Sequence, residues 1–549
     1  AQVCIFITQG LLHSWKQVEQ CEEKHTAASV ETFALPDGDM SLASPENHQR
    51  LLILQGEGGC GKSYLIDAIS DFSNRWNPHD SYEHVVRCAA TNMAAVNIGG
   101  HTIHSLFNLN FSASTKGVPR NSHNYLILLH CDILIVDESS MLTKDMLYSM
   151  NDVLQKVKGS GVPFGGTHVI LAGDLTQLDP TAAHPLYTPF SGDSIHVSER
   201  IGFCLYKQFR TVHFLSHSVR HQSDPTFGTI LHHVRDQCLC EEDYTLLQQQ
   251  HIDLHTTAGD LPAPPTTPPE SLSYFQQLSF RPFCTFHNKT RQAICRRIIQ
   301  LLSVLSEHIL PLRLHADLHT VAGNGPLPPH VKSSIWRLPD HKTKYIPMIL
   351  DLLIGMPVMV TSNEGKALGA VSSRVGFVAG IVTTPDSDNH FTVIPRGGAH
   401  YSYELPTAPE DTPALSSIEY IIVVPKDFSA PVTCRIAGVP VLPIRRARVR
   451  LTVSDSTGHQ HKVVGHQFPL LPAYAVTVTK LQGYTLDEVI ITQDTLHHPD
   501  PKAFYVALSR VRSLANAYFT FVPDQQSLSP ATRPNCHLSK ELARLHEHS

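Results

Sequence analysis

The sequence lacks the features that would assign it to a membrane or to the secretory pathway. No run approaches the 18 or so uninterrupted apolar residues of a membrane helix. The most apolar stretch, residues 345–360, is interrupted by Asp351 and two prolines. No charged segment followed by an apolar one opens the chain, so we expect no secretory signal and no membrane partner. Because the first residue is Ala rather than Met, we expect a piece of a longer polypeptide or a trimmed one.

The sequence also lacks a cysteine pattern that would indicate a disulfide framework or a zinc finger. Its 12 cysteines are scattered and form no C-x-x-C pair. Such thiols are expected to be reduced, in an intracellular protein. The location that we expect is the nucleus. The nearest approach to a metal pattern is His232, His233, Cys238 and Cys240. Four residues so spaced are more often coincidence than a zinc site, and we expect no metal there.

An excess of positive charge is absent as well. The formal net charge is −6 with histidines neutral, which excludes a globally basic nucleic-acid binder but not a locally basic groove. With 42% hydrophobic and 17% charged residues, the composition is that of an ordinary soluble protein. At 549 residues the chain is long enough for three or four domains.

A glycine-rich stretch follows the apolar run 51–54 and precedes a helical pattern carried by Leu65, Ile66, Ile69 and Phe72. A strand, a glycine-rich turn and Lys-Ser opening a helix are the context that a phosphate loop requires. Glycines let the backbone N–H groups surround phosphate oxygens, and the helix N-terminus adds a positive dipole end. Lys62 is expected at the β- and γ-phosphates and Ser63 on Mg²⁺. The predicted ATP-binding residues are Gly56, Glu57, Gly58, Gly59, Cys60, Gly61, Lys62 and Ser63.

Two further apolar runs end in polar residues that suit phosphoryl transfer. Residues 133–136 lead into Asp137 and Glu138; beside a phosphate loop, Asp137 is placed to hold Mg²⁺ and Glu138 to polarise water. Residues 169–174 lead to Gln177, whose amide can sense the γ-phosphate or orient water. Without these neighbours, solvated carboxylates and a polar loop residue would be the simpler interpretations. Arg220 and Arg510 are candidates for a cation that arrives from across a domain interface, although spacing alone does not select them.

The alternation of apolar strand-like and helical runs predicts an α/β protein with two parallel sheets and a small β-rich insertion. Five strands are expected in the first sheet: 51–55, 84–90, 132–137, 167–172 and 211–215. The predicted boundaries are an N-terminal segment of open fold at 1–45, a first domain at 46–210 with a small excursion near 107–124, a second domain at 211–375 and 471–525 with a proline-rich linker at 261–269, the β-rich insertion at 376–470, and a weakly ordered tail at 526–549.

Seven ordered segments resemble the motifs of superfamily-one helicases, most closely the Pif (petite integration frequency) family and its RecD-like relatives. They are GEGGCGKS, AATNMAAVNIGGHTIHSLF, LIVDESSML, PFGGTHVILAGDLTQLDP, VRHQSDPTF, QFPLLPAYAVTVTKLQGYTLDEVII and YVALSRVRS. The resemblance extends from about residue 50 to 522. Two of the phrases, GEGGCGKS and QFPLLPAYAV, look especially like the helicase half of Helitron-type transposons.

The resemblance implies two RecA-like domains with ATP between them, moving 5′→3′ on single-stranded and forked DNA as a monomer. Matched position by position, its ATPase residues are Lys62, Ser63, Asp137, Glu138, Gln177, Arg220 and Arg510. Segments that contact the DNA strand or couple it to ATP correspond to Thr102, His104, Lys480, Gln482 and Gly483. DNA and RNA are both open as the strand.

The chain departs from the family pattern in several places. Cys60 replaces a threonine, and His221 stands where glutamine commonly follows the motif arginine. Thr479 and Leu481 replace the usual His and Ser, which affects DNA coupling more than hydrolysis. Gln20 and Gln49 are both poorly spaced for the glutamine that reads adenine.

These observations together favour an ATP-dependent 5′→3′ DNA helicase. Within the insertion, alternation places Arg446, Arg448 and Arg450 on one strand face, as a phosphate-binding strip or merely a solvated face. The alternative function is a transposon-derived nucleic-acid-binding ATPase that no longer unwinds. A P-loop kinase is disfavoured because it would not need the motifs of the second half.

Overall fold

The computed structural model describes residues 49–76, 83–109, 117–181, 183–189, 196–216, 218–252, 273–305, 312–321, 327–383, 418–426, 432–436, 438–455, 458–493, 500–528 and 536–549. The predicted N-terminal segment 1–45 and the linker 261–269 lie outside these ranges. The chain divides into two compact units: a first unit of Ala1–Arg220 with Arg533–Ser549, and a second unit of His221–Thr532. Among the described helices, none is both long and apolar enough to cross a membrane.

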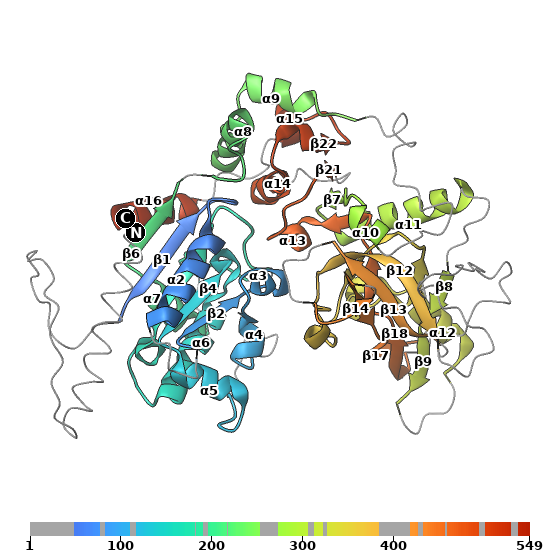
Figure 1. Ribbon diagram of the computed structural model, residues 1–549, viewed down its shortest axis with the longest axis horizontal. Helices are drawn as coiled ribbons and strands as arrows, with labels where there is room; N and C mark the ends of the chain where they lie inside the picture. The colour runs from blue at the N-terminus through green and yellow to red at the C-terminus, as the bar shows by residue number, and fades with distance from the viewer. Residues whose placement is uncertain are drawn as a thin grey trace, which may run out of the picture. The chain divides into compact units, whose positions relative to one another are not determined.

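The first unit is built on a six-stranded sheet in the order β3-β2-β4-β5-β1-β6 (Figure 1). All of its pairings are parallel, for example Leu54 with Ala172 and Val136 with Leu171. The central strands are buried on both faces, which explains their continuous apolar runs. The strands are β1 Leu51–Gly56, β2 Val85–Ala89, β3 His101–Thr102, β4 Ile133–Asp137, β5 His168–Gly173 and β6 Thr211–Leu215.

Helices connect these parallel strands, as a parallel sheet requires. Local signals set their ends: the Thr143 side chain accepts from Met146 N at the start of α6, and Gly159 ends the helix at a φ of +64°. Phe164 and Phe209 pack edge to face in the core beneath. The helices are α2 Lys62–Trp76, α3 Asn92–Asn97, α4 Ile103–Leu106, α5 His123–His130, α6 Lys144–Lys158 and α7 Val197–Tyr206, with 3₁₀ turns η1 Ser139–Met141 and η2 Pro163–Gly166.

The first unit differs from the sequence prediction at both of its ends. β6 pairs with β1, so residues 211–215 form the expected fifth strand of this sheet, and the domain boundary predicted at residue 211 lies too early. The tail was predicted to be weakly ordered, and for its last residues this is wrong. Cys536–Glu547 form helix α16, drawn in red beside β6 in Figure 1.

Helix α16 is held to the first unit by buried contacts from residues more than 300 positions earlier. Leu545 is fully buried in the core that contains Phe209. Glu541, 3% exposed, accepts from Tyr206 Oη at 2.8 Å and pairs with Lys207 Nζ at 2.6 Å. The His546 ring stacks on Phe214 of β6 at 4.2 Å between centroids. An amphipathic helix alone is marginal, so these partners decide its order.

We expect Leu545→Ala to destabilise the first unit by about 2–5 kcal/mol, because it leaves a cavity in a closed core. Urea unfolding with hydrogen exchange at β6 measures the effect. Glu547→Ala, on the exposed side of the same helix, is the control and should change little. Equal stability of the two variants, with unchanged exchange at β6, would show that α16 is not docked in solution.

The second unit contains a smaller parallel sheet in the order β20-β7-β21-β22. Its strands are β7 Phe283–Thr285, β20 Ala475–Thr477, β21 Val489–Ile491 and β22 Ala517–Phe519. The helices of this unit are α8 Pro225–Asp236, α9 Glu241–Gln248, α10 Ser273–Gln277, α11 Asn288–Leu305, α12 Pro329–Trp336, α13 Val478–Leu481, α14 Pro501–Leu508 and α15 Gln525–Leu528, with 3₁₀ turns η4 Asp340–Thr343, η5 Lys366–Leu368 and η8 Leu514–Asn516.

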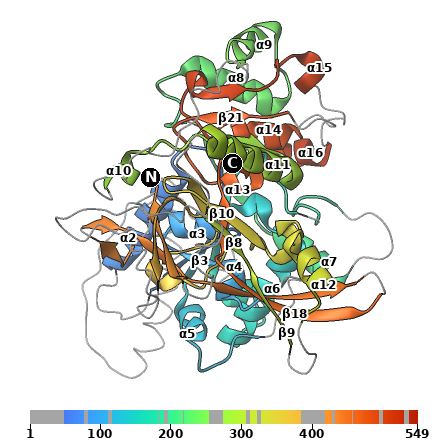
Figure 2. The ribbon, with the colours of Figure 1, turned by 90° about the vertical axis from the view of Figure 1, so that its right-hand side faces the viewer.

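The β-rich part of the second unit is larger than the predicted insertion at 376–470, since its antiparallel strands run from residue 312 to 472. A five-stranded sheet lies in the order β16-β13-β12-β11-β19, and a three-stranded one, β17-β18-β9, forms the long ribbon of Figure 2. Short apolar runs such as 356–361 do not reveal whether their partner will be parallel. The strands are β8 Leu312–His315, β9 Asp317–Thr320, β10 Ile349–Leu352, β11 Pro357–Val360, β12 Val375–Thr383, β13 Ile418–Pro425, β14 Arg435–Ile436, β15 Val439–Pro440, β16 Leu442–Ile444, β17 Ala447–Ser454, β18 Gln460–Gln467 and β19 Leu470–Pro472.

Candidate nucleotide and nucleic-acid site

The glycine-rich stretch 56–63 is the turn between β1 and the 15-residue helix α2. Gly59 and Gly61 have φ of +85° and +90°, the left-handed region that glycine adopts without strain. Gly59 also has no room for a side chain, since a Cβ there would lie 2.3 Å from Arg220 Cβ. The turn therefore has the conformation of an anion-binding loop at the N-terminus of a helix.

Lys62 is folded back over this loop. Its Nζ donates to Gly56 O at 2.6 Å and to Glu57 O at 2.8 Å. These carbonyls hold the ammonium above the turn, so a bound phosphate would have to exchange with them. Ser63 opens α2 and is exposed.

Cys60 is buried beneath the loop, with Sγ 4.0 Å from Lys62 Nζ. Burial raises the pKa of its thiol, more than the Lys62 ammonium lowers it. The side chain is therefore an uncharged thiol at neutral pH.

Asp137 and Glu138 stand at the end of β4. Asp137 is 7% exposed, and its Oδ1 has no hydrogen-bond partner among the residues that the structure describes. Burial, and next the charge of Glu138, raise the pKa of Asp137 to about 7, although Lys62 opposes the shift. Glu138 takes a left-handed φ of 52°, which turns the chain away from the strand. A buried carboxylate oxygen without a donor fits a site for a cation.

Gln177 follows β5 and is 3% exposed. Its Nε2 donates to Asp174 Oδ2 at 3.2 Å, and its Oε1 has no hydrogen-bond partner in the described part of the chain. Asp174, itself 1% exposed, also accepts from Gln55 and from the Thr176 hydroxyl. The sequence analysis did not assign Asp174 a role. Its position at the end of an apolar strand, three residues before Gln177, was the available signal.

Arg220 lies against the phosphate loop. The N–H groups of Val219 and Arg220 both donate to Gly59 O, at 2.9 and 3.3 Å. Arg220 is the last residue of the first unit, whereas the sequence pattern placed it in the second half or at its edge. His221, the next residue, is buried and its Nε2 lies 3.2 Å from Val511 O.

Together these groups follow the ends of β1, β4, β5 and β6. Because the four strands are parallel neighbours, their carboxyl ends share one edge of the sheet, where ligands bind in such folds.

The side chain of Gln49, one of the two glutamines considered for reading adenine, is bonded within the first unit. Its Nε2 donates to Pro163 O and Thr167 O at 2.6 and 2.7 Å. A role for Gln49 in reading adenine is therefore not supported.

Arg510 lies in the second unit and is 2% exposed. Its guanidinium donates to Val506 O at 2.7 Å, to Ser509 Oγ at 2.7 Å and to Tyr484 O at 3.4 Å. These bonds attach it to the end of α14 and to the turn that follows Gly483. The three hydrogen bonds fix the position of the Arg510 side chain. The catalytic role predicted for Arg510 stays a prediction.

The residues expected to meet a nucleic-acid strand lie in two places. In the first unit, Thr102 caps α4 by accepting from Ser105 N at 3.3 Å, and burial lowers the pKa of His104. In the second unit, Lys480 lies in the last turn of α13, which is followed by the buried Gln482 and by Gly483 at a φ of +85°.

Two residues that the sequence analysis missed hold Lys480. Its Nζ donates to Ser373 Oγ at 3.2 Å and lies 5.4 Å from the ring centroid of Tyr345. Burial, and next the charge of Arg291, lower the pKa of Lys480. Tyr345 and Ser373 have φ of 60° and 74°, strained values for residues with side chains. They stand in irregular loops of the β-rich part, and no motif marks them.

A phosphate loop after β1, and an acidic pair at the end of β4 of a parallel sheet, define the P-loop nucleotide-binding class of proteins. Comparison with known families is more specific, since residues 41–243 match the PIF1-like helicase family. The chain is therefore similar to PIF1-like helicases over this region. Its resemblance to the helicase half of Helitron-type transposons stays a prediction.

The chain is similar to the ATP-dependent DNA helicase PIF1 of Candida albicans (28% identity, covering 34% of this chain and 21% of the relative) and to the ATP-dependent DNA helicase PIF7 of Trypanosoma brucei brucei (24% identity, covering 86% and 44%). It thus spans between a fifth and a half of the length of these curated relatives.

Solved structures share the fold across most of the chain. The Pif1 helicase of Candida albicans matches with a TM-score of 0.60 at 19% identity, over 93% of this chain and 100% of that one. The Bacteroides Pif1 bound to single-stranded DNA matches with a TM-score of 0.56 at 21% identity, over 91% and 94%. The α/β class predicted from the sequence is confirmed.

Proposed function

We propose that this protein is an ATP-dependent DNA helicase that moves 5′→3′ on single-stranded DNA and unwinds duplex DNA. The observation that carries the proposal is the convergence of the phosphate loop, Asp137–Glu138, Gln177 and Arg220 at one edge of the first sheet. The relatives that this chain matches are named ATP-dependent DNA helicases. The proposed partners are single-stranded and forked DNA. We propose that the protein acts as a monomer in the nucleus.

The residues at this edge suit Mg-ATP. Asp137 has a buried oxygen without a donor, and Ser63 offers a hydroxyl at the start of α2, so these two would hold Mg²⁺. When bound, the ion would neutralise phosphate charge. Lys62 would exchange its bonds to Gly56 O and Glu57 O for phosphate oxygens.

The remaining groups are assigned to the attacking water and to the developing charge. Glu138 takes a proton from the water, and the Gln177 amide orients it. Arg220 and Arg510 stabilise the charge that builds up on the phosphoryl oxygens. None of these steps requires Cys60 to ionise, which is consistent with its raised pKa.

For the nucleic-acid strand we propose Thr102, His104, Lys480, Gln482 and Gly483 as contact or coupling residues. Arg446, Arg448 and Arg450 form a second candidate surface. Arg448 and Arg450 alternate with buried residues along β17 and are exposed, and Arg446 precedes the strand with the same spacing. This supports a strip of phosphate contacts on the ribbon.

The experiment that tests the function is ATP turnover with and without single-stranded DNA, followed by strand separation on duplexes with either 5′ or 3′ overhangs. We expect turnover to rise with DNA and unwinding to require a 5′ overhang. DNA-stimulated turnover without separation on either substrate would favour the alternative, a transposon-derived ATPase that binds nucleic acid but no longer unwinds. Turnover indifferent to DNA would overturn both.

We expect Arg510→Ala to leave ATP affinity within a fewfold while sharply lowering DNA-stimulated turnover and abolishing unwinding. The charge would act on the transition state more than on the bound nucleotide. Because Arg510 is buried and bonded to three acceptors, lysine cannot replace its planar fork, and Arg510→Lys should rescue poorly.

Thermal unfolding of both Arg510 variants is the control for lost packing. Arg512→Ala, which removes an exposed arginine two residues away, should retain activity. If Arg510→Ala keeps full turnover, or loses it only in proportion to its unfolded fraction, the catalytic assignment is wrong.

A further inference from the structure

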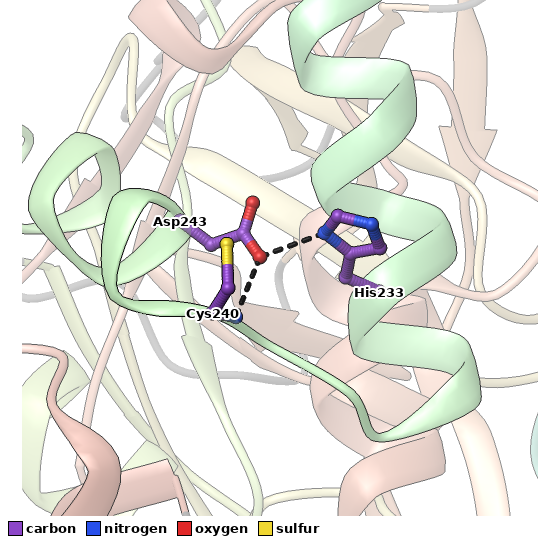
Figure 3. Close-up of side chains that lie close together, drawn as sticks. All are labelled: His233, Cys240 and Asp243. Carbon is purple, nitrogen blue, oxygen red and sulfur yellow. Dashed lines mark hydrogen bonds and ion pairs between the residues drawn. The ribbon is translucent and has the colours of Figure 1, made fainter.

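The turn between α8 and α9 brings together a histidine, a cysteine and an aspartate that the proposed ATPase does not use. His233 comes from the last turn of α8, Cys240 caps the start of α9, and Asp243 lies in the first turn of α9 (Figure 3). One ligand atom from each lies within 4.8 Å of the other two. In the sequence, the nearest approach to a metal pattern was His232, His233, Cys238 and Cys240. In the structure, two of these residues, His233 and Cys240, lie together with Asp243.

The spacing of these atoms is close to that of a metal coordination shell. His233 Nδ1 lies 2.7 Å from Asp243 Oδ2, which also accepts from Cys240 N at 2.8 Å. Around tetrahedral Zn²⁺, ligand atoms stand roughly 3.3–3.7 Å apart, as follows from bond lengths of about 2.0–2.3 Å. The imidazole and the carboxylate would have to separate by roughly half an ångström, and the thiol would have to close in. The side chains of His233 and Cys240 are the more exposed of the three and are the ones free to rotate.

The three groups have the chemistry of a zinc site. Thiolate, imidazole and carboxylate oxygen are the ligands that Zn²⁺ takes in proteins, and three of them leave the fourth position for water. On binding, the thiol of Cys240 would release its proton to solvent, and the proton of His233 would move to Nε2.

Helix capping accounts for only part of the arrangement. Asp243 and Cys240 satisfy a capping box, for which a serine or threonine hydroxyl is the usual partner. Capping requires neither a thiol nor His233, whose side chain is 34% exposed while that of Asp243 is 7% exposed. A metal would use all three groups at once and would tie the end of α8 to the start of α9.

We propose that His233, Cys240 and Asp243 form a binding site for a single divalent zinc-type ion that fastens the α8–α9 turn. A metal that holds the α8–α9 turn would also affect the packing of α8 within the second unit. α8 packs against α14, and its cap Asp224 accepts from Leu514 N at 3.0 Å. A metal at the other end of α8 would stabilise the helix that supports the segment before Arg510.

The test is titration of the purified, chelator-treated chain with Co²⁺ and Zn²⁺. We expect one equivalent of Co²⁺ to give the near-ultraviolet band of a thiolate–cobalt bond, and Zn²⁺ to displace it. This band is specific to cysteine, which matters because 35 histidines offer weak background sites. Zn²⁺ should raise the unfolding temperature of the wild-type protein.

Variants separate the proposed ligands from their neighbours. Cys240→Ser and His233→Ala should each lower Zn²⁺ affinity by at least the ~100-fold that loss of an outer-shell partner can cost, and Cys240→Ser should remove the cobalt band. His232→Ala and Cys238→Ala are the matched controls and should bind normally. Absence of a stoichiometric thiolate band in the wild type would overturn the proposal, and so would equal losses in the controls.

Discussion

Replacing Lys62 by alanine is expected to abolish ATP hydrolysis. The structure holds the Lys62 ammonium directly on the phosphate loop, bonded to Gly56 O and Glu57 O. Its removal takes a positive charge away from the γ-phosphate during transfer, which raises the barrier by several kcal/mol. On the scale of about 1.4 kcal/mol per tenfold, the rate should fall by 10³-fold or more.

Binding of single-stranded DNA should survive in part in Lys62→Ala, because the proposed strand contacts lie elsewhere, at residues such as Thr102 and Lys480. Phosphate release measured with saturating DNA gives the turnover, and fluorescence anisotropy gives the affinity for the strand. Tyr64→Ala is the matched control, since Tyr64 is two residues further along the same helix and 81% exposed. Near wild-type turnover in Lys62→Ala would mean that residues 56–63 are not the phosphate loop.

Glu138→Gln should preserve ATP binding while lowering turnover by roughly 10²-fold or more. The amide has the shape of the carboxylate and can still meet the water, but it cannot take a proton. Rapid mixing with a fluorescent ATP analogue measures binding, and phosphate release measures turnover. Asp137→Asn is the comparison, and it should weaken binding of the metal–nucleotide complex. Normal turnover in Glu138→Gln with lost turnover in Asp137→Asn would reverse the two roles.

Glu138→Gln should also change how the stability of the folded protein depends on pH. The charge of Glu138 is the second cause, after burial, of the raised pKa of Asp137, so the neutral glutamine should lower that pKa from about 7. A raised carboxyl pKa means that the folded state holds a proton which the unfolded chain releases near pH 3.9. The cost to stability therefore grows as pH rises from about 4 toward 7, and Glu138→Gln should reduce it. Unfolding temperatures of the metal-free proteins at pH 5 and pH 8 measure the difference.

Much of the first unit followed from local pattern. The apolar runs before Gly56, Asp137 and Asp174 became the buried strands β1, β4 and β5, because strands covered on both faces must be apolar throughout. The residues that follow these strands share one edge because parallel strands share a direction. Where the pattern was wrong, as for the start of the β-rich part at residue 376, the apolar runs were too short to distinguish antiparallel from parallel pairing.

The sequence by itself therefore predicted the phosphate loop, the acidic pair, the similarity to PIF1-like helicases and the parallel sheet that carries these residues. Only the tertiary structure decided that the chain's last helix, α16, completes the first unit, that Lys480 is held by Tyr345 and Ser373, and that His233 and Cys240 meet Asp243. The physical reason is the range of the interactions. Motifs and strand periodicity depend on a few neighbouring residues, so the sequence alone shows them. Burial, pKa shifts and contacts between distant segments depend on residues that meet only after the chain has folded.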